Sequence, residues 1–127
     1  MIVMDSSAAV SGLLRAGPAR QAFVTDQVHV PHLIDTEVAH SLRQLVAARR
    51  LAADAAATLL RRWASLGVIR YGSRGLLTRV WDLRDNLTAY DATFVALAEA
   101  LGCALLTADG RLARAPGVDC AVTVVPR

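Results

Sequence analysis

The sequence contains no lysine, because all fourteen of its basic side chains are arginines. A P-loop nucleotide site needs a lysine against the phosphates, and a response-regulator receiver pairs its aspartates with one. Nucleotide hydrolysis of the P-loop type and phospho-signalling are therefore excluded. Arginine presents a planar fork of donors that suits phosphate oxygens. The net charge of +3 is thus compatible with a nucleic-acid partner, although charge alone does not indicate one.

Cysteines and long apolar runs are also scarce. Cys103 and Cys120 lack C-x-x-C spacing, and we interpret them as core residues without a metal or disulfide. No apolar stretch approaches the roughly 20 residues of a membrane span, and Asp5 stands where a signal peptide would carry positive charge. With 127 residues, 54% of them hydrophobic, the chain is expected to form one cytoplasmic globular domain spanning residues 1–127.

Short apolar segments alternate with segments of helical periodicity along the chain. The strands do not alternate polar and apolar residues, which is typical of a parallel sheet covered on both faces. The predicted fold class is therefore α/β, with a central short parallel sheet flanked by helices on both faces. The expected strands are 2–4, 28–30, 68–71, 104–107 and 121–125, and the expected helices are 8–15, 19–24, 32–48, 52–66, 76–83, 88–101 and 109–115.

Two aspartates follow predicted strands. Asp5 comes directly after the strand 2–4, and Asp109 comes two residues after the strand 104–107. In open parallel sheets, ligands bind beyond the carboxyl ends of the strands. If these strands are neighbours, both carboxylates reach the same edge. Aspartate is also a preferred helix N-cap, so a capping role stays open for each residue.

Two further acids lie on predicted helices, at the margin of the buried face. Glu37 borders the apolar stripe that contains Val38, and Asp91 precedes Phe94 at helical spacing. Ordinary roles stay open, because Asp91 could close a capping box with Thr88 and Glu37 could be a surface residue favoured by the helix dipole. An acid at an apolar margin nevertheless needs a partner. Without lysine, that partner must be an arginine, a backbone donor or a metal ion.

Four carboxylates at one point repel one another unless a divalent cation neutralises them. Oxygen-only ligation favours Mg²⁺ or Mn²⁺, since zinc sites usually include histidine or cysteine. The three histidines lack the spacing of a zinc motif and are interpreted as structural or surface residues. His40, three positions after Glu37, forms a single Glu-x-x-His where di-iron bundles need two. The candidate metal ligands and catalytic residues are Asp5, Glu37, Asp91 and Asp109.

These four acids stand in segments that resemble the acidic motifs of the PIN-domain family. The matching segments are 2–8, Glu37 after Pro31, 90–92 at the start of a helix, and 105–112, and they agree with the family in order and spacing. The resemblance covers the whole chain. Its size and ending are closest to the VapC-type toxins of bacterial toxin–antitoxin pairs.

The resemblance implies a metal-dependent endoribonuclease, the toxin of a type II toxin–antitoxin pair. The four acids would hold one or two Mg²⁺ or Mn²⁺ ions, and Ser6 and Thr107 would orient ligands or water beside them. Metal-activated water would attack the RNA phosphodiester. Surrounding arginines would attract the RNA, and the candidates by proximity to the motifs are Arg43, Arg79, Arg84 and Arg111.

The resemblance also implies two protein partners. One is a second copy of the chain in a homodimer, and the other is a cognate antitoxin that lays a helical segment along a groove. Two other functions stay open: a degenerate PIN-like binding module without catalysis, and a metal-dependent DNA nuclease or phosphatase. Candidates for the groove or dimer surface, for which a core role is the more common alternative, are Leu59, Leu60, Trp63, Leu77 and Trp81.

Overall fold

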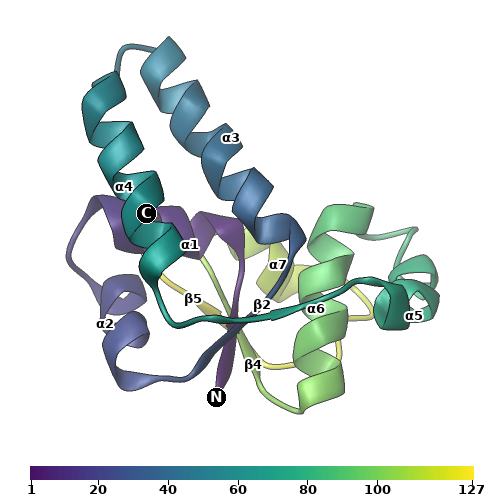
Figure 1. Ribbon diagram of the computed structural model, residues 1–127. Helices are drawn as coiled ribbons and strands as arrows, with labels where there is room; N and C mark the ends of the chain where they lie inside the picture. Colours follow the sequence, from purple (N-terminus) through teal and green to yellow (C-terminus); the bar gives the residue numbers. More distant parts are fainter.

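Five short strands form one sheet in the computed structural model, which describes all residues, 1–127 (Figure 1). The strand order is β3-β2-β1-β4-β5, and every pairing is parallel. β1 and β4 are neighbours at the centre of the sheet, with Met4 opposite Leu106. The strands are β1 (Ile2–Met4), β2 (Val28–Pro31), β3 (Ile69–Tyr71), β4 (Ala104–Thr107) and β5 (Val122–Val124).

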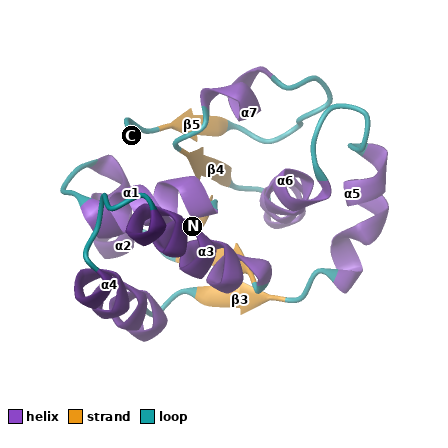
Figure 2. Cartoon of the chain, turned by 90° about the horizontal axis from the view of Figure 1, so that it is seen from above, coloured by secondary structure: helices purple, strands orange, loops and turns teal.

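Helices cover both faces of this sheet. Figure 2 shows α1, α2 and α4 to one side and α5 and α6 to the other. The predicted α/β class is confirmed, and each predicted element has its counterpart. No helix combines the length and the apolar character needed to cross a membrane. The helices are α1 (Ser6–Leu14), α2 (Pro18–Thr25), α3 (Leu33–Ala47), α4 (Ala53–Ser65), α5 (Leu77–Asp82), α6 (Ala89–Leu101) and α7 (Gly110–Arg114), with a 3₁₀ turn at Arg74–Leu76.

The hydrophobic core lies on both faces of the sheet, and α6 has more buried residues than any other helix. Seven consecutive residues of this helix, 92–98, are buried, so α6 has almost no solvent-facing side in its middle turns. It contacts β1, β2 and β4. Cys103 and Cys120 are free, partly buried thiols packed against the same core, which agrees with their predicted location. A helix held this firmly fixes the position of any residue in its first turn.

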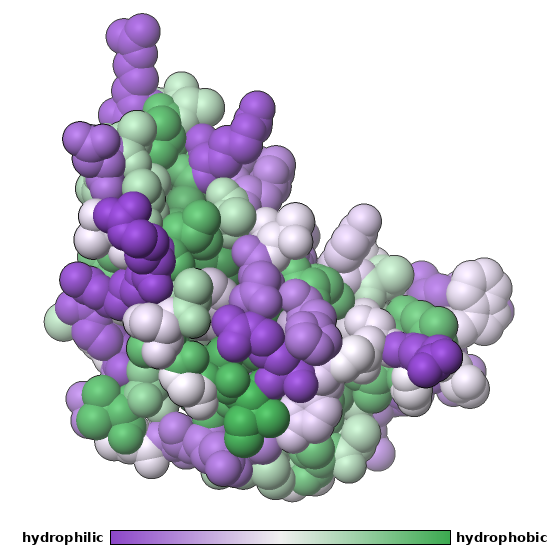
Figure 3. Space-filling view, in the orientation of Figure 1, coloured by the Kyte–Doolittle hydropathy of each residue, from purple (hydrophilic) through white to green (hydrophobic).

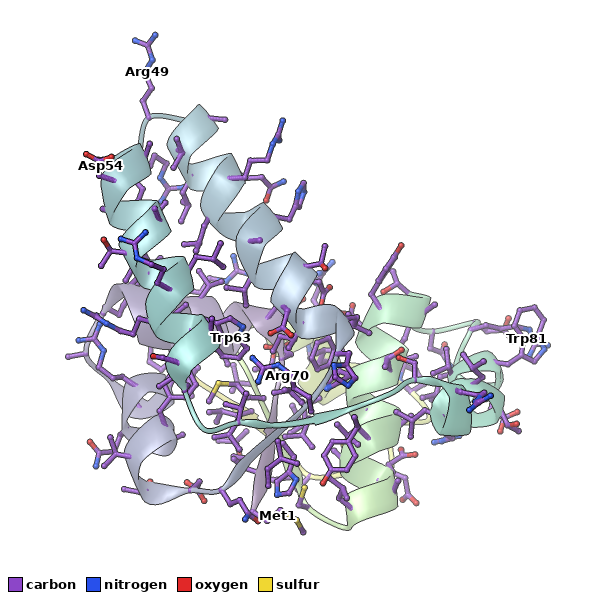
Figure 4. All side chains as sticks on the ribbon, in the orientation of Figure 1. Met1, Arg49, Asp54, Trp63, Arg70 and Trp81 are labelled. Atoms are coloured by element: carbon purple, nitrogen blue, oxygen red, sulfur yellow. The ribbon has the colours of Figure 1, made fainter.

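Helices α3 and α4 form a hairpin that stands away from the sheet (Figure 1). Apolar side chains gather between its two helices, and hydrophilic ones dominate its outer sides (Figure 3). The base of the hairpin is tied by the carboxylate of Asp35, which accepts two hydrogen bonds from Arg70, at 2.8 and 3.0 Å, and one from Trp63 Nε1 at 2.8 Å. Trp63 and Arg70 lie close together at this base in Figure 4. One carboxylate thus joins α3, α4 and β3.

We expect Asp35→Ala to lower the free energy of unfolding by about 2 kcal/mol, because charge-assisted hydrogen bonds are lost and the indole N–H of a buried tryptophan loses its acceptor. Urea unfolding at neutral pH measures the change. The matched control is Asp85→Ala, since Asp85 is exposed and has no hydrogen bond or ion pair through its side chain. Equal losses in the two variants would contradict this role of Asp35.

Candidate active site

The carboxyl ends of β1 and β4 bring Asp5 and Thr107 together. Asp5 is only 5% exposed. Its Oδ1 accepts hydrogen bonds from the Ala8 backbone N–H at 3.0 Å and from Ser7 Oγ at 2.7 Å, and its Oδ2 accepts one from the Thr107 hydroxyl. Burial raises the pKa of Asp5, and these hydrogen bonds oppose that rise. Asp5 is therefore the N-cap of α1, as one alternative proposed, and is also a carboxylate held in a fixed orientation at the sheet edge.

Ser7 is the residue that the sequence reasoning missed. Besides its bond to Asp5, its Oγ accepts a hydrogen bond from the Ala108 backbone N–H at 2.8 Å and lies 3.2 Å from Thr107 Oγ1. Ser6 makes no side-chain hydrogen bond to an acid, although both serines line a neighbouring groove. The reason is helical geometry, because the second residue of α1 points back to the cap at Asp5. The Asp-Ser-Ser sequence carries this signal only as a choice between two adjacent serines.

Glu37 reaches the same edge from the first turns of α3. Its Oε1 is buried and has no hydrogen-bond partner, the only such side-chain atom in the structure. Burial, followed by the charges of Asp91 and Asp5, raises the pKa of Glu37 to about 7. A carboxylate in this state requires either a proton or a cation. The surface role that the sequence left open for Glu37 does not fit a buried oxygen.

Asp91 lies in the first turn of α6. The side chain of Thr88 caps this helix and accepts a hydrogen bond from the Asp91 backbone N–H at 3.1 Å. The Asp91 side chain is half-buried, and its pKa is raised by burial and then by the charge of Asp109. Thr88 thus performs the capping, and the carboxylate of Asp91 forms no ion pair.

Asp109 differs from the other three acids in having a cationic partner. It caps α7, and the guanidinium of Arg111 donates hydrogen bonds to both of its carboxylate oxygens, with Nη2 to Oδ2 at 2.6 Å. This pair holds the pKa of Asp109 below its usual range. Arg111 is otherwise exposed, with 82% of its side chain accessible. One of the four acids is therefore already paired with a basic side chain.

Electrostatically the four acids form one group, since each raised pKa has another of them among its causes: Asp91 for Asp5, Asp91 and Asp5 for Glu37, and Asp109 for Asp91. No three side chains of histidine, cysteine, aspartate or glutamate converge closely enough to hold one ion as they stand. Mutual repulsion of uncompensated carboxylates favours a wider separation of the acids than a bound ion would require. The donor set is entirely oxygen, with one buried oxygen lacking any partner. These residues fit a hard divalent cation such as Mg²⁺ or Mn²⁺.

Three of the arginines chosen for proximity to the motifs make no hydrogen bond or ion pair with an acid of this group. Arg79 is a correction, because it forms an ion pair with Glu99 at 2.6 Å and donates to the Gly117 carbonyl at 2.7 Å, which is a structural role. Arg84 lies 4.7 Å from the Trp81 ring. Arg43 is exposed on α3 without a side-chain partner. Of the four candidates, only Arg111 touches an acid of the site.

The histidines have the ordinary roles that the sequence suggested. His29 is buried, and its ring nitrogens bond Tyr71 Oη at 2.6 Å and Gln27 Oε1 at 3.0 Å. Burial lowers the pKa of His29. His32 and His40 are exposed. No histidine therefore competes with the acids as a site residue.

The proposed apolar surface residues divide into two groups. Trp63 is 1% exposed and belongs to the core, and Leu59 is partly buried against it. Leu60 is at the boundary, with 36% exposed. Leu77 and Trp81 are 56% and 66% exposed, and Trp81 points outward from the far end of the α5 region (Figure 4). Only the α5 residues remain strong candidates for a contact with another chain.

Comparison with known proteins agrees with this architecture. A family model for the PIN domain matches residues 2–118. Ribonuclease VapC9 from Mycobacterium tuberculosis is 51% identical over 127 residues, covering 100% of both chains. Ribonuclease VapC1 from the same organism is 40% identical, covering 97% of this chain and 96% of the relative. Among solved structures, VapBC2 from Rickettsia felis, bound to a promoter DNA fragment, has a TM-score of 0.70 at 12% identity, covering 98% of this chain and 99% of that chain.

Proposed function

The chain belongs to the PIN-domain family and to its VapC ribonucleases, and on that premise we propose that Asp5, Glu37, Asp91 and Asp109 form the metal-dependent centre of a toxin endoribonuclease. The observation that carries this proposal is the buried Oε1 of Glu37, which has no partner and faces the charges of Asp91 and Asp5. A purely structural carboxylate at this position would be expected to have a donor, as Asp35 has in Arg70 and Trp63.

The cation class follows from the donors. All four candidate ligands are carboxylates, which favour Mg²⁺ or Mn²⁺ over zinc. When bound, such an ion supplies activated water for attack on the phosphodiester and stabilises charge on the phosphate oxygens. Four carboxylates can hold one or two such ions, and the proposal covers both numbers.

The protein's own residues prepare this site in three ways. Ser7 and Thr107 hold both oxygens of Asp5, so its orientation does not depend on the ligand. In the metal-free protein, burial and the charges of Asp91 and Asp5 raise the pKa of Glu37 to about 7, and a bound cation would take the place of that proton. Arg111 presents an exposed guanidinium beside Asp109, and this fork can contact a phosphate oxygen of the substrate.

The proposed partners follow from the family. RNA is the substrate, and a cognate antitoxin is the inhibitory partner. A homodimer belongs to the proposal, with the exposed Leu77 and Trp81 as candidate contact residues. The cytoplasm, where RNA is accessible, is the proposed location. A single domain over residues 1–127 contains all of the proposed site.

Cleavage of a mixed RNA pool by the purified protein tests the proposal. We expect cutting in Mg²⁺ or Mn²⁺, no cutting in EDTA, and no cutting by the Asp91→Asn variant, which also controls for a contaminating nuclease. Parallel reactions with single-stranded RNA, structured RNA, DNA and a small phosphate ester separate a ribonuclease from the alternative DNA nuclease or phosphatase. Metal-dependent cutting of DNA alone, or no Mg²⁺ or Mn²⁺ binding by the folded protein, would contradict the proposal.

A further inference from the structure

A groove of about 610 Å³ lies between α1 and α3, directly beside the acids. Its volume is within the range of ligand sites, roughly 300 to 1,000 Å³. Ser7 and Ala108 line one end, and these residues are chain neighbours of the acidic site. Figure 1 shows α1 crossing beneath the α3–α4 hairpin, with the C-terminus of the chain beside it. The groove thus borders the edge of the sheet where the acids stand.

The chemistry of this α1–α3 groove is cationic. None of its thirteen lining residues is acidic, and three are arginines: Arg15, Arg50 and Arg127. Arg15 and Arg50 are exposed and have no side-chain hydrogen bond or ion pair, so their guanidinium groups are free. Arg127 donates from Nε to the Ala108 carbonyl at 3.3 Å, next to Asp109. Most other polar contacts would come from hydroxyl and amide groups, those of Ser6, Ser7, Ser11, Ser41 and Gln44.

We propose that the α1–α3 groove binds the phosphate backbone of a single-stranded RNA and leads it to the acids, with Arg15, Arg50 and Arg127 contacting phosphates. This inference rests on the proposed ribonuclease function and adds the residues that bind its substrate. Four carboxylates repel a polyanion, so attraction must come from outside the acidic pocket. Guanidinium forks and hydroxyl groups are the donors that bind phosphate and sugar without reading base sequence.

The groove also supplies the basic residues that the arginines near the motifs do not provide. Arg79 is occupied by Glu99 and Gly117, and Arg84 lies against Trp81. Arg15 and Arg50 were not among the candidates chosen from the sequence, yet both line the groove that borders the site. With three guanidinium groups and no acidic side chain, the lining of the groove suits a polyanion. An acidic segment of a partner protein shares part of this chemistry and is separated from RNA by the test below.

The test measures RNA binding independently of cleavage. In an Asp91→Asn background with Mg²⁺, the affinity for a short fluorescent single-stranded RNA of mixed sequence is measured by anisotropy over a range of salt concentrations. Each phosphate contact adds about 0.7 to the salt slope for a single strand. The Arg15→Gln/Arg50→Gln variant is therefore expected to lower the slope by about 1.4, and to lower affinity about 25-fold at about 0.1 M salt.

The matched control is Arg61→Gln/Arg62→Gln, which removes the same charge from exposed positions of α4 outside the groove. Its slope and affinity are expected to stay close to those of the parent. Equal losses in both double variants, or no RNA binding by the parent, would overturn the proposal. So would retained RNA binding combined with lost binding of an acidic peptide such as polyglutamate, because the groove would then serve a protein partner.

The same variants, with all four acids intact, separate this inference from the proposed function. Cleavage by the intact protein that is unchanged in Arg15→Gln/Arg50→Gln would overturn the groove and leave the ribonuclease standing. Groove-dependent RNA binding without metal-dependent cleavage would support the groove and contradict the catalytic proposal. Circular dichroism of each double variant verifies that the fold is retained.

Discussion

Replacing Glu37 by glutamine is expected to stabilise the metal-free protein by about 2 kcal/mol at about pH 8 while abolishing RNA cleavage. The pKa of Glu37, about 7 against an ordinary value of 4.5, corresponds at most to about 3 kcal/mol. Partial exposure of the side chain reduces this to about 2 kcal/mol. The neutral amide removes both the buried charge and its repulsion with Asp91 and Asp5. Urea unfolding in EDTA measures the stability, and the RNA assay in Mg²⁺ measures the activity.

The pH dependence of stability has a definite sign. The pKa of Glu37 is higher in the folded protein than in the unfolded chain, so the folded protein binds more protons between pH 4.5 and about 7. The parent protein should therefore lose stability as pH rises from 4.5 through about 7, and Glu37→Gln should lose less over that window. The raised pKa values of Asp5 and Asp91 act in the same direction. Added Mg²⁺ should raise the melting temperature of the parent more than that of the variant.

Glu99→Gln is the matched control, because the identical substitution should have the opposite effect there. The ion pair with Arg79 holds the pKa of Glu99 below its usual range, so its charge contributes to stability. This variant is expected to be less stable than the parent at neutral pH and to retain cleavage. Destabilisation by Glu37→Gln in EDTA, or full activity of that variant, would show that Glu37 is a structural residue.

The positions of the acids could be predicted because they follow from topology. A parallel sheet places the ends of neighbouring strands at one edge, so Asp5 and Asp109 depended only on the order of β1 and β4. Glu37 and Asp91 could be placed because apolar periodicity fixes which side of a helix is buried. Each of these inferences uses local pattern and one general rule of sheet architecture.

The positively charged residues could not be placed in this way. Arg79 is close in sequence to the Asp91 motif, but α5 packs where its guanidinium meets Glu99, two turns further along α6. Arg15 and Arg50 line the same groove only because α1 packs against α3. Such tertiary proximity leaves no periodic signal in the sequence. Arginine side chains are also long, so that a small change in backbone position changes the partner they reach.

The sequence alone could not decide whether Ser6 or Ser7 supports Asp5. Both serines follow Asp5, and either hydroxyl can be drawn beside a ligand from sequence alone. The structure separates them because the helix begins at Ser6, which turns Ser7 Oγ toward Asp5 and the Ala108 backbone. One residue of helix phase decides which hydroxyl supports the carboxylate.

Asp5→Asn is expected to reduce RNA cleavage in Mg²⁺ by about 10³-fold while leaving the fold intact. Asparagine is as good an N-cap as aspartate and has nearly the same shape, so α1 should still begin at Ser6. The loss corresponds to several kcal/mol of charge stabilisation by a bound ion, which a neutral amide supports poorly. Single-turnover cleavage rates and circular dichroism measure the two effects. A folded variant with unchanged activity would assign Asp5 to capping alone.

Substitutions of the residues that hold Asp5 are expected to reduce activity less than Asp5→Asn does. Ser7→Ala and Thr107→Val each remove one hydrogen bond to Asp5, and losses of a residue that orients a ligand typically cost about 10- to 100-fold in activity or metal affinity. Ser6→Ala should have a much smaller effect on both, since its hydroxyl bonds no acid. Metal affinity by titration calorimetry supplies a readout besides cleavage. If Ser6→Ala lowers metal affinity as much as Ser7→Ala does, the helix phase does not determine which serine supports the site. If neither lowers it, Asp5 is oriented by the Ala8 N–H and Thr107 without help from the serines.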